Sequence, residues 1–404
     1  MSHLCFDVSA VFPAECVSQS LATYLYNIKE KIHTCEKEWD IYKKYTNTYE
    51  YIHTVVHHKK KSVSKYKPLS RSYFKMIELL HEFQLVDFST SPSISTNPPN
   101  VFSRSVSALP GVVPPGLRPI RTFHLAEGPG GFIEAVVNTR KTPGDVYIGM
   151  TILDDKQDPH IPAWKKSDLF LYSHPNVHIE KGGDGTGDIL SLANFDHCIA
   201  QYASSMDFIT ADGGFDFSTD FNKQEMMIAR LLFAQIAFAL ALQKQHGNFV
   251  LKLFDCFYAN TLDLLYVLSS MYKTVYIAKP QTSRAGNSEK YVVCKGFLPD
   301  SAESFVPRLR GIFMEMSNPL GWPYIHRFLR VPLPAYFMTR VEEYNSIFGQ
   351  QQIENIHTTL SMIDKAVKPD RLEHGIQLNL TKCMNWCIRH NVPYHVFTNH
   401  NVFL

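Results

Sequence analysis

The sequence predicts an α/β protein with a mostly parallel, seven-stranded sheet that contains one antiparallel strand. Short apolar runs alternate with helical patterns along most of the chain, which is the order that a parallel sheet requires. The last two runs are joined by residues 278–289, which have no helical pattern, so these two runs should pair antiparallel. The expected strands are residues 123–126, 146–150, 177–179, 208–211, 249–253, 274–277 and 290–294.

The composition is that of an ordinary globular chain with room for one large or two modest domains. It has 404 residues, of which 45% are hydrophobic and 19% charged. The net charge of +2 means that any affinity for nucleic acid must come from local patches. The 8 cysteines follow no disulfide pattern, and no signal peptide opens the chain, so we expect free thiols and a protein that stays inside a cell. The longest apolar run, residues 226–242, is too short and too polar to span a membrane and predicts a buried helix.

The N-terminal part is predicted to be helical. Residues 18–51 mix lysines and glutamates in a pattern typical of a solvated helix face. A lysine-rich run follows, which is either a solvated loop or a track for RNA phosphates. Its members are Lys59, Lys60, Lys61, Lys65 and Lys67. The next segment, from Ser70, has the spacing of an amphipathic helix, with Lys75 near its apolar side. A lysine that keeps its head group in water is the alternative explanation of Lys75. Residues 89–119 are rich in Ser, Pro and Asn and predict a loop.

A glycine-rich turn separates the first expected strand from a helix that begins at Phe132. It reads Gly128, Pro129, Gly130 and Gly131. Glycines allow backbone conformations closed to other residues and let a ligand approach the main chain. The spacing is not Gly-x-Gly-x-x-Gly, which disfavours a dinucleotide. The turn therefore predicts a cofactor cradle, with a plain structural turn as the alternative.

Three ionisable residues should lie at the same edge of the sheet as this turn. Asp212 follows one strand, Lys252 ends another, and Glu289 precedes the reversed strand. Ligands of open α/β sheets bind beyond the carboxyl ends of the strands. Asp212 could instead form a turn, and Glu289 could pair with Lys290 or Arg284 on the surface. A lysine within a continuous apolar run is costly unless it is paired, which favours a functional role for Lys252.

These residues resemble those of the FtsJ-like S-adenosylmethionine-dependent RNA 2'-O-ribose methyltransferases over residues 67–297. The family's catalytic tetrad of Lys, Asp, Lys and Glu falls in order on Lys75, Asp212, Lys252 and Glu289. Residues 184–189 and 279–289 look like the cap-specific branch of the family. The resemblance implies a Rossmann-like methyltransferase domain at residues 67–300, an N-terminal helical extension at 1–66 and a C-terminal extension at 301–404.

The resemblance also implies S-adenosyl-L-methionine as the cofactor. The methionine part should lie along Gly128, Pro129, Gly130, Gly131 and Phe132. By position, Asp154 or Asp155 should contact the adenosine ribose, and Asp184 or Asp188 the adenine region. The turn begins Ala126-Glu127 where many relatives have Asp, which leaves the contact to the amino-acid end of the cofactor open.

The chemistry explains why the tetrad needs these residue types. A ribose 2'-hydroxyl is a poor nucleophile, so the protein must align it with the methyl group and remove its proton. A lysine can accept that proton only if burial and a neighbouring cation lower its pKa. We expect Lys252 to be the base and Lys75 the neighbouring cation, while Asp212 and Glu289 orient the amines and the ribose.

The expected partner is RNA, with capped mRNA as the preferred substrate and no membrane. The residues expected to contact RNA are Lys59, Lys60, Lys61, Lys65, Lys67, Arg71, Ser283, Arg284 and Asn287. Uncapped or ribosomal RNA is the alternative substrate. A non-catalytic RNA-binding scaffold is the alternative function, which the complete tetrad disfavours. The resemblance extends to members of the family in large cytoplasmic DNA viruses, so the cytoplasm, or the virion if the source is viral, is the expected location.

The C-terminal extension contains residue types that bind zinc, namely Cys383, Cys387, His390 and His395. The spacing of the cysteines is not that of a zinc knuckle, and a packed helix explains them as well, so we expect no metal. Four arginines, Arg308, Arg310, Arg327 and Arg330, lie among apolar residues. They suggest a continuation of the RNA groove or a surface for a protein partner, with solvated side chains as the simpler interpretation.

Overall fold

The structure is a computed structural model. It describes residues 1–13, 16–56, 59–88, 117–153, 163–214, 224–317, 324–365 and 369–397. The predicted cofactor contacts Asp154 and Asp155 and most of the predicted loop at 89–119 lie outside the described residues.

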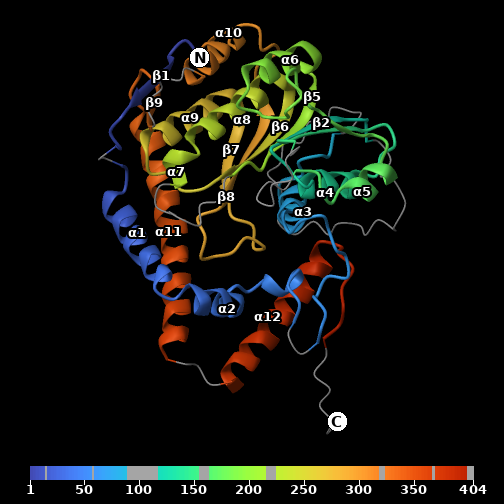
Figure 1. Cartoon of the computed structure of the whole chain (residues 1–404), viewed down its shortest axis with the longest axis vertical. Helices are drawn as coiled ribbons and strands as arrows, with labels where there is room; N and C mark the ends of the chain where they lie inside the picture. The colour runs from blue at the N-terminus through green and yellow to red at the C-terminus, as the bar shows by residue number, and fades with distance from the viewer. Residues whose placement is uncertain are drawn as a thin grey trace.

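A seven-stranded sheet forms the centre of the molecule (Figure 1). The strands follow the order β4-β3-β2-β5-β6-β8-β7. They are β2 (Arg121–Leu125), β3 (Val146–Met150), β4 (Val177–Ile179), β5 (Met206–Ala211), β6 (Gln243–Leu253), β7 (Tyr272–Ala278) and β8 (Lys290–Phe297). Neighbours pair in parallel except β8, which runs antiparallel to both β6 and β7. The predicted sheet with one reversed strand is therefore confirmed.

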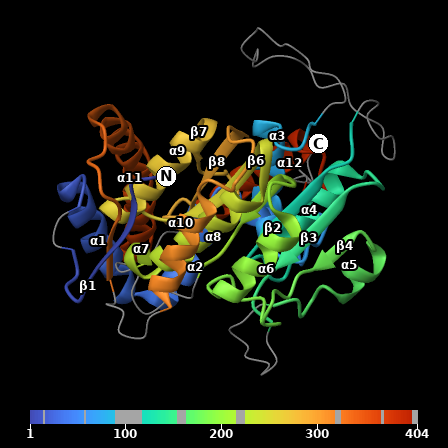
Figure 2. The same ribbon diagram turned by 90° about the horizontal axis from the view of Figure 1, so that it is seen from above.

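Apolar residues that alternate along the strands fill a core on each face of the sheet. Phe249 and Leu251 of β6 belong to one core, and Val250 between them belongs to the other. Helices on the first face are α6 (Leu192–Tyr202), α8 (Ala229–Leu242), α9 (Ala259–Met271) and α10 (Val306–Met316). Helices on the second face are α3 (Ser72–Phe83), α4 (Gly131–Arg140) and α12 (Pro369–Arg389). Figure 2 shows these layers from above.

The buried helix predicted at residues 226–242 is confirmed for residues 229–242, whereas the first two residues of the run belong to a separate short helix. α7 (Gln224–Met227) ends before α8 begins, although α8 is buried along nearly its whole length. Glu225 accepts hydrogen bonds from the backbone N–H groups of Phe257 and Tyr258, which holds α7 against the start of α9. No helix of the described segments has the length and apolar character needed to cross a membrane.

The N-terminal extension contains the predicted helices together with a strand that was not predicted. The helices are α1 (Gln19–His33), α2 (Glu36–Thr46) and the 3-10 helix η1 (Glu50–Ile52). The strand β1 (Leu4–Ser9) pairs antiparallel with β9 (Tyr324–Leu329) of the C-terminal extension. Its partner is more than three hundred residues away in sequence, so no local pattern signals the pairing.

The C-terminal extension wraps around the same body. The long helix α11 (Ala335–Asp364) runs beside α1 on the opposite side of the molecule from α5 (Asp168–Ser173), as both views show (Figures 1 and 2). α12 buries Leu380, Cys383 and Trp386 in the core shared with α3 and α4. The two extensions are therefore packed into the central body of the protein.

Candidate active site

Two ammonium–carboxylate pairs meet at the carboxyl edge of the sheet. Lys75 on α3 places its Nζ atom 2.6 Å from Oε1 of Glu289, the residue before β8. Lys252 in β6 places its Nζ atom 3.3 Å from Oδ1 of Asp212 and donates to the Asp212 carbonyl at 2.6 Å. The four residues predicted from separate parts of the sequence thus form one cluster.

Burial and mutual charge set the titration of this cluster. Burial lowers the pKa of Lys75, while the neighbouring Glu289 opposes that shift. Burial alone would raise the pKa of Glu289, but Lys75 and Lys252 outweigh it and hold that pKa below its usual range. Lys75 is only 6% exposed, so the interpretation of a lysine with its head group in water is wrong. The surface pairing of Glu289 with Lys290 or Arg284 is also wrong, since those residues pair with Asp255 and Glu50.

Glycines after β5 make room for the Asp212–Lys252 pair. The N–H of Gly213 donates to Oε1 of Gln235 on α8 at 2.8 Å, which fixes the turn that follows Asp212. A Cβ atom at Gly214 would lie 3.2 Å from Nζ of Lys252. A side chain at that position would crowd the lysine amine, which explains the Asp-Gly-Gly sequence in structural terms.

The glycine-rich turn between β2 and α4 packs tightly against other parts of the protein. Gly130 has a φ of +106°, a conformation that favours glycine. A Cβ atom at Gly131 would collide with the hydroxyls of Ser70 and Ser72 at the start of α3, and one at Gly128 with the carbonyl of Ala163. These two glycines are therefore needed for packing, as the structural alternative supposed, and contact with a cofactor remains a prediction.

Glu127 in this turn has a role that the sequence reasoning left open. Its carboxylate accepts hydrogen bonds from the N–H groups of Phe132 at 2.7 Å and Ile133 at 3.1 Å, at the start of α4. Burial, reinforced by the charge of Asp212, raises the pKa of Glu127 well above its usual value. Glu127 lies a few residues before the first free N–H groups of a helix, and this position in the sequence could have indicated that its carboxylate binds them.

The acidic loop after β4 lies beside the end of β3. The N–H of Leu153 donates to the carbonyl of Thr186 at 2.8 Å, which sets this position. Asp184 is exposed, and its carboxylate accepts hydrogen bonds from Thr186 and Ser191, which outweigh slight burial and lower its pKa. Asp188 is half-buried and accepts from the N–H of Leu190. Both predicted adenine contacts are thus near the expected strand ends, and Asp184 also organises its own loop.

The lysine-rich run forms a turn at the surface. Val56 and Lys61 make an antiparallel bridge, and Lys60, Lys61, Lys65 and Lys67 are exposed. Lys59 places its Nζ atom 5.5 Å from the ring centre of Phe397. The structure leaves both interpretations of this run open, since exposed lysines suit a solvated loop and a phosphate track equally.

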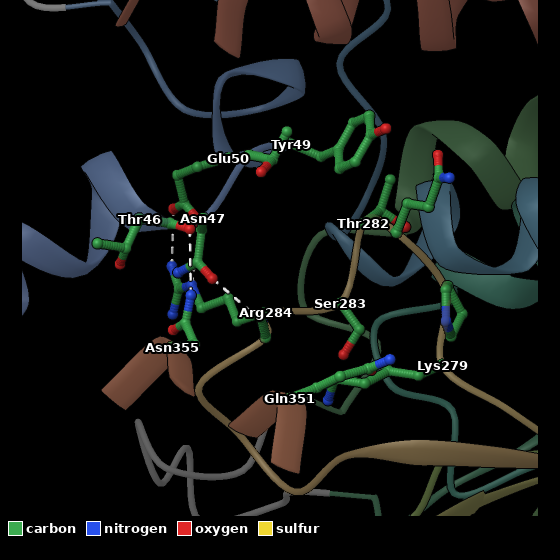
Figure 3. A pocket seen from close by; sticks show the side chains of 14 residues that line it. Thr46, Asn47, Tyr49, Glu50, Lys279, Thr282, Ser283, Arg284, Gln351 and Asn355 are labelled. Atoms are coloured by element: carbon green, nitrogen blue, oxygen red, sulfur yellow. Dashed lines mark hydrogen bonds and ion pairs between the residues drawn. The ribbon is translucent and has the colours of Figure 1, made fainter. Parts of the chain in front are cut away.

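The remaining predicted RNA contacts lie around the loop between β7 and β8. Arg284 makes two hydrogen bonds to the carboxylate of Glu50, and Ser283 donates to Oε1 of Glu289 at 2.9 Å. Figure 3 shows Arg284 against Glu50 and Asn47 on one side of a cavity of about 300 Å³, with Ser283 and Lys279 facing them. Arg71, which precedes α3, is half-buried and close enough to lower the pKa of Lys75.

A second cavity, of about 510 Å³, is lined by the later part of this loop and shares Asn47 and Arg284 with the first. Its lining includes Trp39 from α2, Phe254 after β6, Asn287 and Ser288. Nζ of Lys252 lies 5.7 Å from the ring centre of Phe254, so this cavity adjoins the tetrad. Trp39 was not predicted as a site residue because it occurs in a helix whose sequence indicates only a charged, solvated face.

Lys279 at the start of the loop was also missed. Its Nζ atom donates to the carbonyl and side-chain oxygens of Asn287 at 2.7 and 3.0 Å and to the carbonyl of Glu289 at 2.8 Å. Burial, helped by the charge of Lys290, lowers the pKa of Lys279 to about 7. Lys279 begins the segment at 279–289 that resembles the cap-specific branch of the family, and this resemblance could have indicated it.

The candidate zinc ligands of the C-terminal extension are packed in or near α12. Among the described residues no cluster of His, Cys, Asp or Glu has the geometry of a metal site. Cys383 donates to the carbonyl of Thr48, and His390 pairs with His81 of α3. Three arginines of the extension make contacts within the chain: Arg308 with Leu4, Arg310 with Asp196, and Arg327 with Asp263.

The fold and this cluster define a Rossmann-like methyltransferase class. The sequence profile of the FtsJ-like methyltransferases matches residues 68–297, which is more than half of the chain. The chain therefore belongs to the FtsJ-like methyltransferase family, whose methyl donor is S-adenosyl-L-methionine. The residues present fit this donor, because a glycine-rich turn follows β2 and the carboxylate of Asp212 directly follows the neighbouring strand β5.

The curated relatives are described as cap-specific mRNA (nucleoside-2'-O-)-methyltransferases. The Drosophila melanogaster enzyme 2 is 28% identical over 253 residues, covering 60% of this chain and 36% of its own length. The Trypanosoma brucei enzyme 1 is 41% identical over 119 residues, covering 29% and 32%. The Leishmania braziliensis enzyme 1 is 37% identical over 193 residues, covering 44% and 45%. The chain thus spans less than half the length of each of these relatives.

A solved structure described as a ribosomal RNA methyltransferase from Plasmodium falciparum aligns with 57% of this chain and 98% of its own. Its sequence identity is 18% and its TM-score 0.36. A score this low supports no argument about the fold or substrate of the present protein.

Proposed function

We propose that this protein transfers a methyl group from S-adenosyl-L-methionine to the ribose 2'-hydroxyl of RNA, with a 5'-proximal nucleotide of capped mRNA as its target. The observation that carries the proposal is the cluster of Lys75, Asp212, Lys252 and Glu289 at the carboxyl edge of the sheet. The printed names of the curated relatives support capped mRNA as the substrate.

The four side chains have different roles in the reaction. The bound cofactor supplies a methyl group that is already electrophilic. Lys252, held by the carboxylate and the carbonyl of Asp212, accepts the proton of the 2'-hydroxyl when its amine is neutral. Asp212 fixes the direction of that amine. Lys75 and Glu289 form a rigid ion pair that orients the ribose beside it.

RNA enters this site along the loop between β7 and β8. Two cavities flank the loop, and their linings come from the N-terminal extension, the loop and α11. Asn287 and Ser288, which directly precede Glu289, line the larger cavity. Exposed lysines such as Lys60 and Lys65 extend the basic surface that would contact phosphates. We place this reaction in the cytoplasm, with the C-terminal extension available to a protein partner.

The test is methyl transfer from labelled cofactor to capped and uncapped versions of the same RNA, followed by nuclease mapping of the methylated nucleotide. We expect label on a 2'-oxygen near the cap of the capped RNA. Lys252→Ala should abolish transfer. Lys244→Ala is the matched control, because Lys244 lies on the same strand with a side chain 52% exposed. Equal transfer to both RNAs would contradict the preference for a cap, and no transfer to either would contradict the proposal.

A further inference from the structure

The loop that carries Glu289 has no regular secondary structure of its own. It runs from residue 279 to residue 289 and projects from the sheet toward α2 and α12 (Figure 1). Its conformation therefore depends on side chains from other elements that hold its backbone. The loop is held at Arg284 by Glu50 and, nearer its beginning, by the carboxylate of Glu78 on α3. Glu78 accepts hydrogen bonds from the N–H groups of Gln281 at 2.6 Å and Thr282 at 3.3 Å, and from the Thr282 hydroxyl at 3.3 Å.

Glu78 and the tetrad residue Lys75 lie three residues apart on the same helix. Residues with this spacing share one face of a helix. Lys75 reaches the end of the loop through its 2.6 Å contact with Glu289, and Glu78 reaches the beginning. One face of α3 therefore contacts the loop at two points, one near its beginning and one at its end.

A third element completes the surroundings of Glu78. Nε1 of Trp386 on α12 donates to Oε2 of Glu78 at 3.1 Å. The indole is buried and makes an edge contact with Phe74 of α3, with ring centres 5.9 Å apart. Glu78 is only 5% exposed, and a carboxylate that is buried to this extent is costly without donors. The donors from the loop and from α12 thus stabilise the buried carboxylate.

We propose that Glu78 is a positioning residue, which holds the loop bearing Glu289 against the helix face bearing Lys75. Trp386 of α12 supports this arrangement through its hydrogen bond to Glu78. The expected effect of Glu78 on kcat rests on the proposed methyl transfer, whereas its expected effect on the conformation of the loop does not. α12 lies outside the segment that matches the family, so this support comes from a part of the chain whose sequence shows no relation to the reaction.

The experiment compares Glu78→Ala, Glu78→Gln and Trp386→Phe in the full chain. Hydrogen–deuterium exchange of residues 279–289 measures how firmly the loop is held in place. The constants kcat and KM, together with calorimetric cofactor binding, measure how the position of the loop affects the reaction. Glu78→Ala should raise exchange in the loop and lower kcat roughly 10- to 100-fold, with cofactor affinity unchanged, because the reacting groups are misplaced. Glu78→Gln keeps one acceptor oxygen and should fall between Glu78→Ala and the wild type. Trp386→Phe keeps a ring against Phe74 and should have a smaller effect of the same kind.

Glu82→Ala is the matched control, since Glu82 is exposed and lies one turn further along α3. It should behave as the wild type. The proposal is overturned if Glu78→Ala leaves loop exchange and kcat unchanged, or if exchange rises equally over the whole chain and cofactor binding is abolished. Should Glu78→Ala fail to fold, the other two variants decide by the same readouts. A wild-type protein that methylates neither RNA would refute the proposed function, while loop exchange would still decide the role of Glu78.

Discussion

Nζ of Lys75 lies 2.6 Å from Oε1 of Glu289, so an ion pair joins a helix on one face of the sheet to the loop that precedes β8. Both side chains are largely buried, with 8% and 12% of their surfaces exposed. In such surroundings, a charge without its partner is more damaging than the removal of both charges. This asymmetry leads to a test of the pair.

Lys75→Met should destabilise the protein by about 3 kcal/mol, because it leaves the carboxylate of Glu289 buried without its partner. The double variant Lys75→Met/Glu289→Gln should recover most of that stability and remain inactive. Urea unfolding of both variants, alongside the methyl-transfer assay, measures the two effects separately. A single variant as stable as the wild type would show that the pair contributes nothing to folding.

Lys252→Arg should be as inactive as Lys252→Ala. A guanidinium stays protonated at any workable pH, so it cannot accept the proton of the ribose hydroxyl. Cofactor binding should survive both changes, because the glycine-rich turn follows a different strand, β2. Calorimetry with the cofactor and methyl transfer to capped RNA are the two measurements. Substantial activity in Lys252→Arg would mean that the proton leaves by another route.

Gly131→Ala should impair both stability and activity. The added Cβ would collide with the hydroxyls of Ser70 and Ser72, so the start of the helix that carries Lys75 must shift. Removing these hydroxyls in Gly131→Ala/Ser70→Ala/Ser72→Ala should restore part of the decrease in melting temperature. Gly375→Ala is the control, because a Cβ there meets no neighbouring atom. Equal melting temperatures for the wild type and Gly131→Ala would refute the close approach of α3 and the turn.

Two buried histidines should contribute less to stability as the pH is lowered from 7 to 5. Burial lowers the pKa of His124 from 6.5 to about 3, and burial together with His81 does the same for His390. At these two histidines the unfolded chain binds more protons than the folded one between pH 7 and 5, so their contribution to stability decreases as the pH falls through 6.5. Each histidine adds a slope of up to about 1.4 kcal/mol per pH unit.

Urea unfolding at a series of pH values checks this expectation. His124→Gln should remove one part of the slope, whatever its effect on stability at pH 7. His178→Gln should leave the slope unchanged, since His178 is exposed on β4. An identical slope in His124→Gln and the wild type would contradict the neutral, buried state of His124.

The lysine-rich turn offers a test of RNA binding. Replacing Lys60, Lys61, Lys65 and Lys67 by Gln should weaken RNA binding and make it less sensitive to salt. The log–log slope against salt concentration should decrease by about one for each phosphate that the variant no longer neutralises. Fluorescence anisotropy at several salt concentrations measures both quantities. Replacing the exposed Lys37 and Lys181 in the same way should change neither. An unaltered slope in the first variant would identify the turn as a solvated loop.

The sheet and three members of the tetrad could be predicted because local patterns determine them. The second half of β6 and most of β8 are apolar runs, and the rule that parallel strands expose their carboxyl ends at one edge brought Asp212, Lys252 and Glu289 together. Lys75 was predicted from the family resemblance, since the sequence around a helical lysine does not indicate which carboxylate it will pair with. The same limit applies to Glu78, whose partners are backbone groups distant in sequence.

The features that were missed depend on contacts between distant segments. The pairing of β1 with β9 joins the two extensions, and the sequence near either strand does not indicate this pairing. The apolar pattern also continues through the break between α7 and α8, and the hydrogen bonds of Glu225 to residues just before α9 leave no mark in that pattern. Trp386 looked like an ordinary core residue of a packed helix, and its bond to Glu78 could not be inferred from its own helix.

The position of α12 has a consequence for the timing of synthesis. A ribosome completes the family-matching segment, which ends at residue 297, before it has made α12. A nascent chain at that stage already contains all four tetrad residues but lacks Trp386, which supports the carboxylate that holds the loop. The loop that carries Glu289 would therefore gain this support only after α12 has been made, so a growing chain that ends before Trp386 should hold this loop less firmly than the full chain.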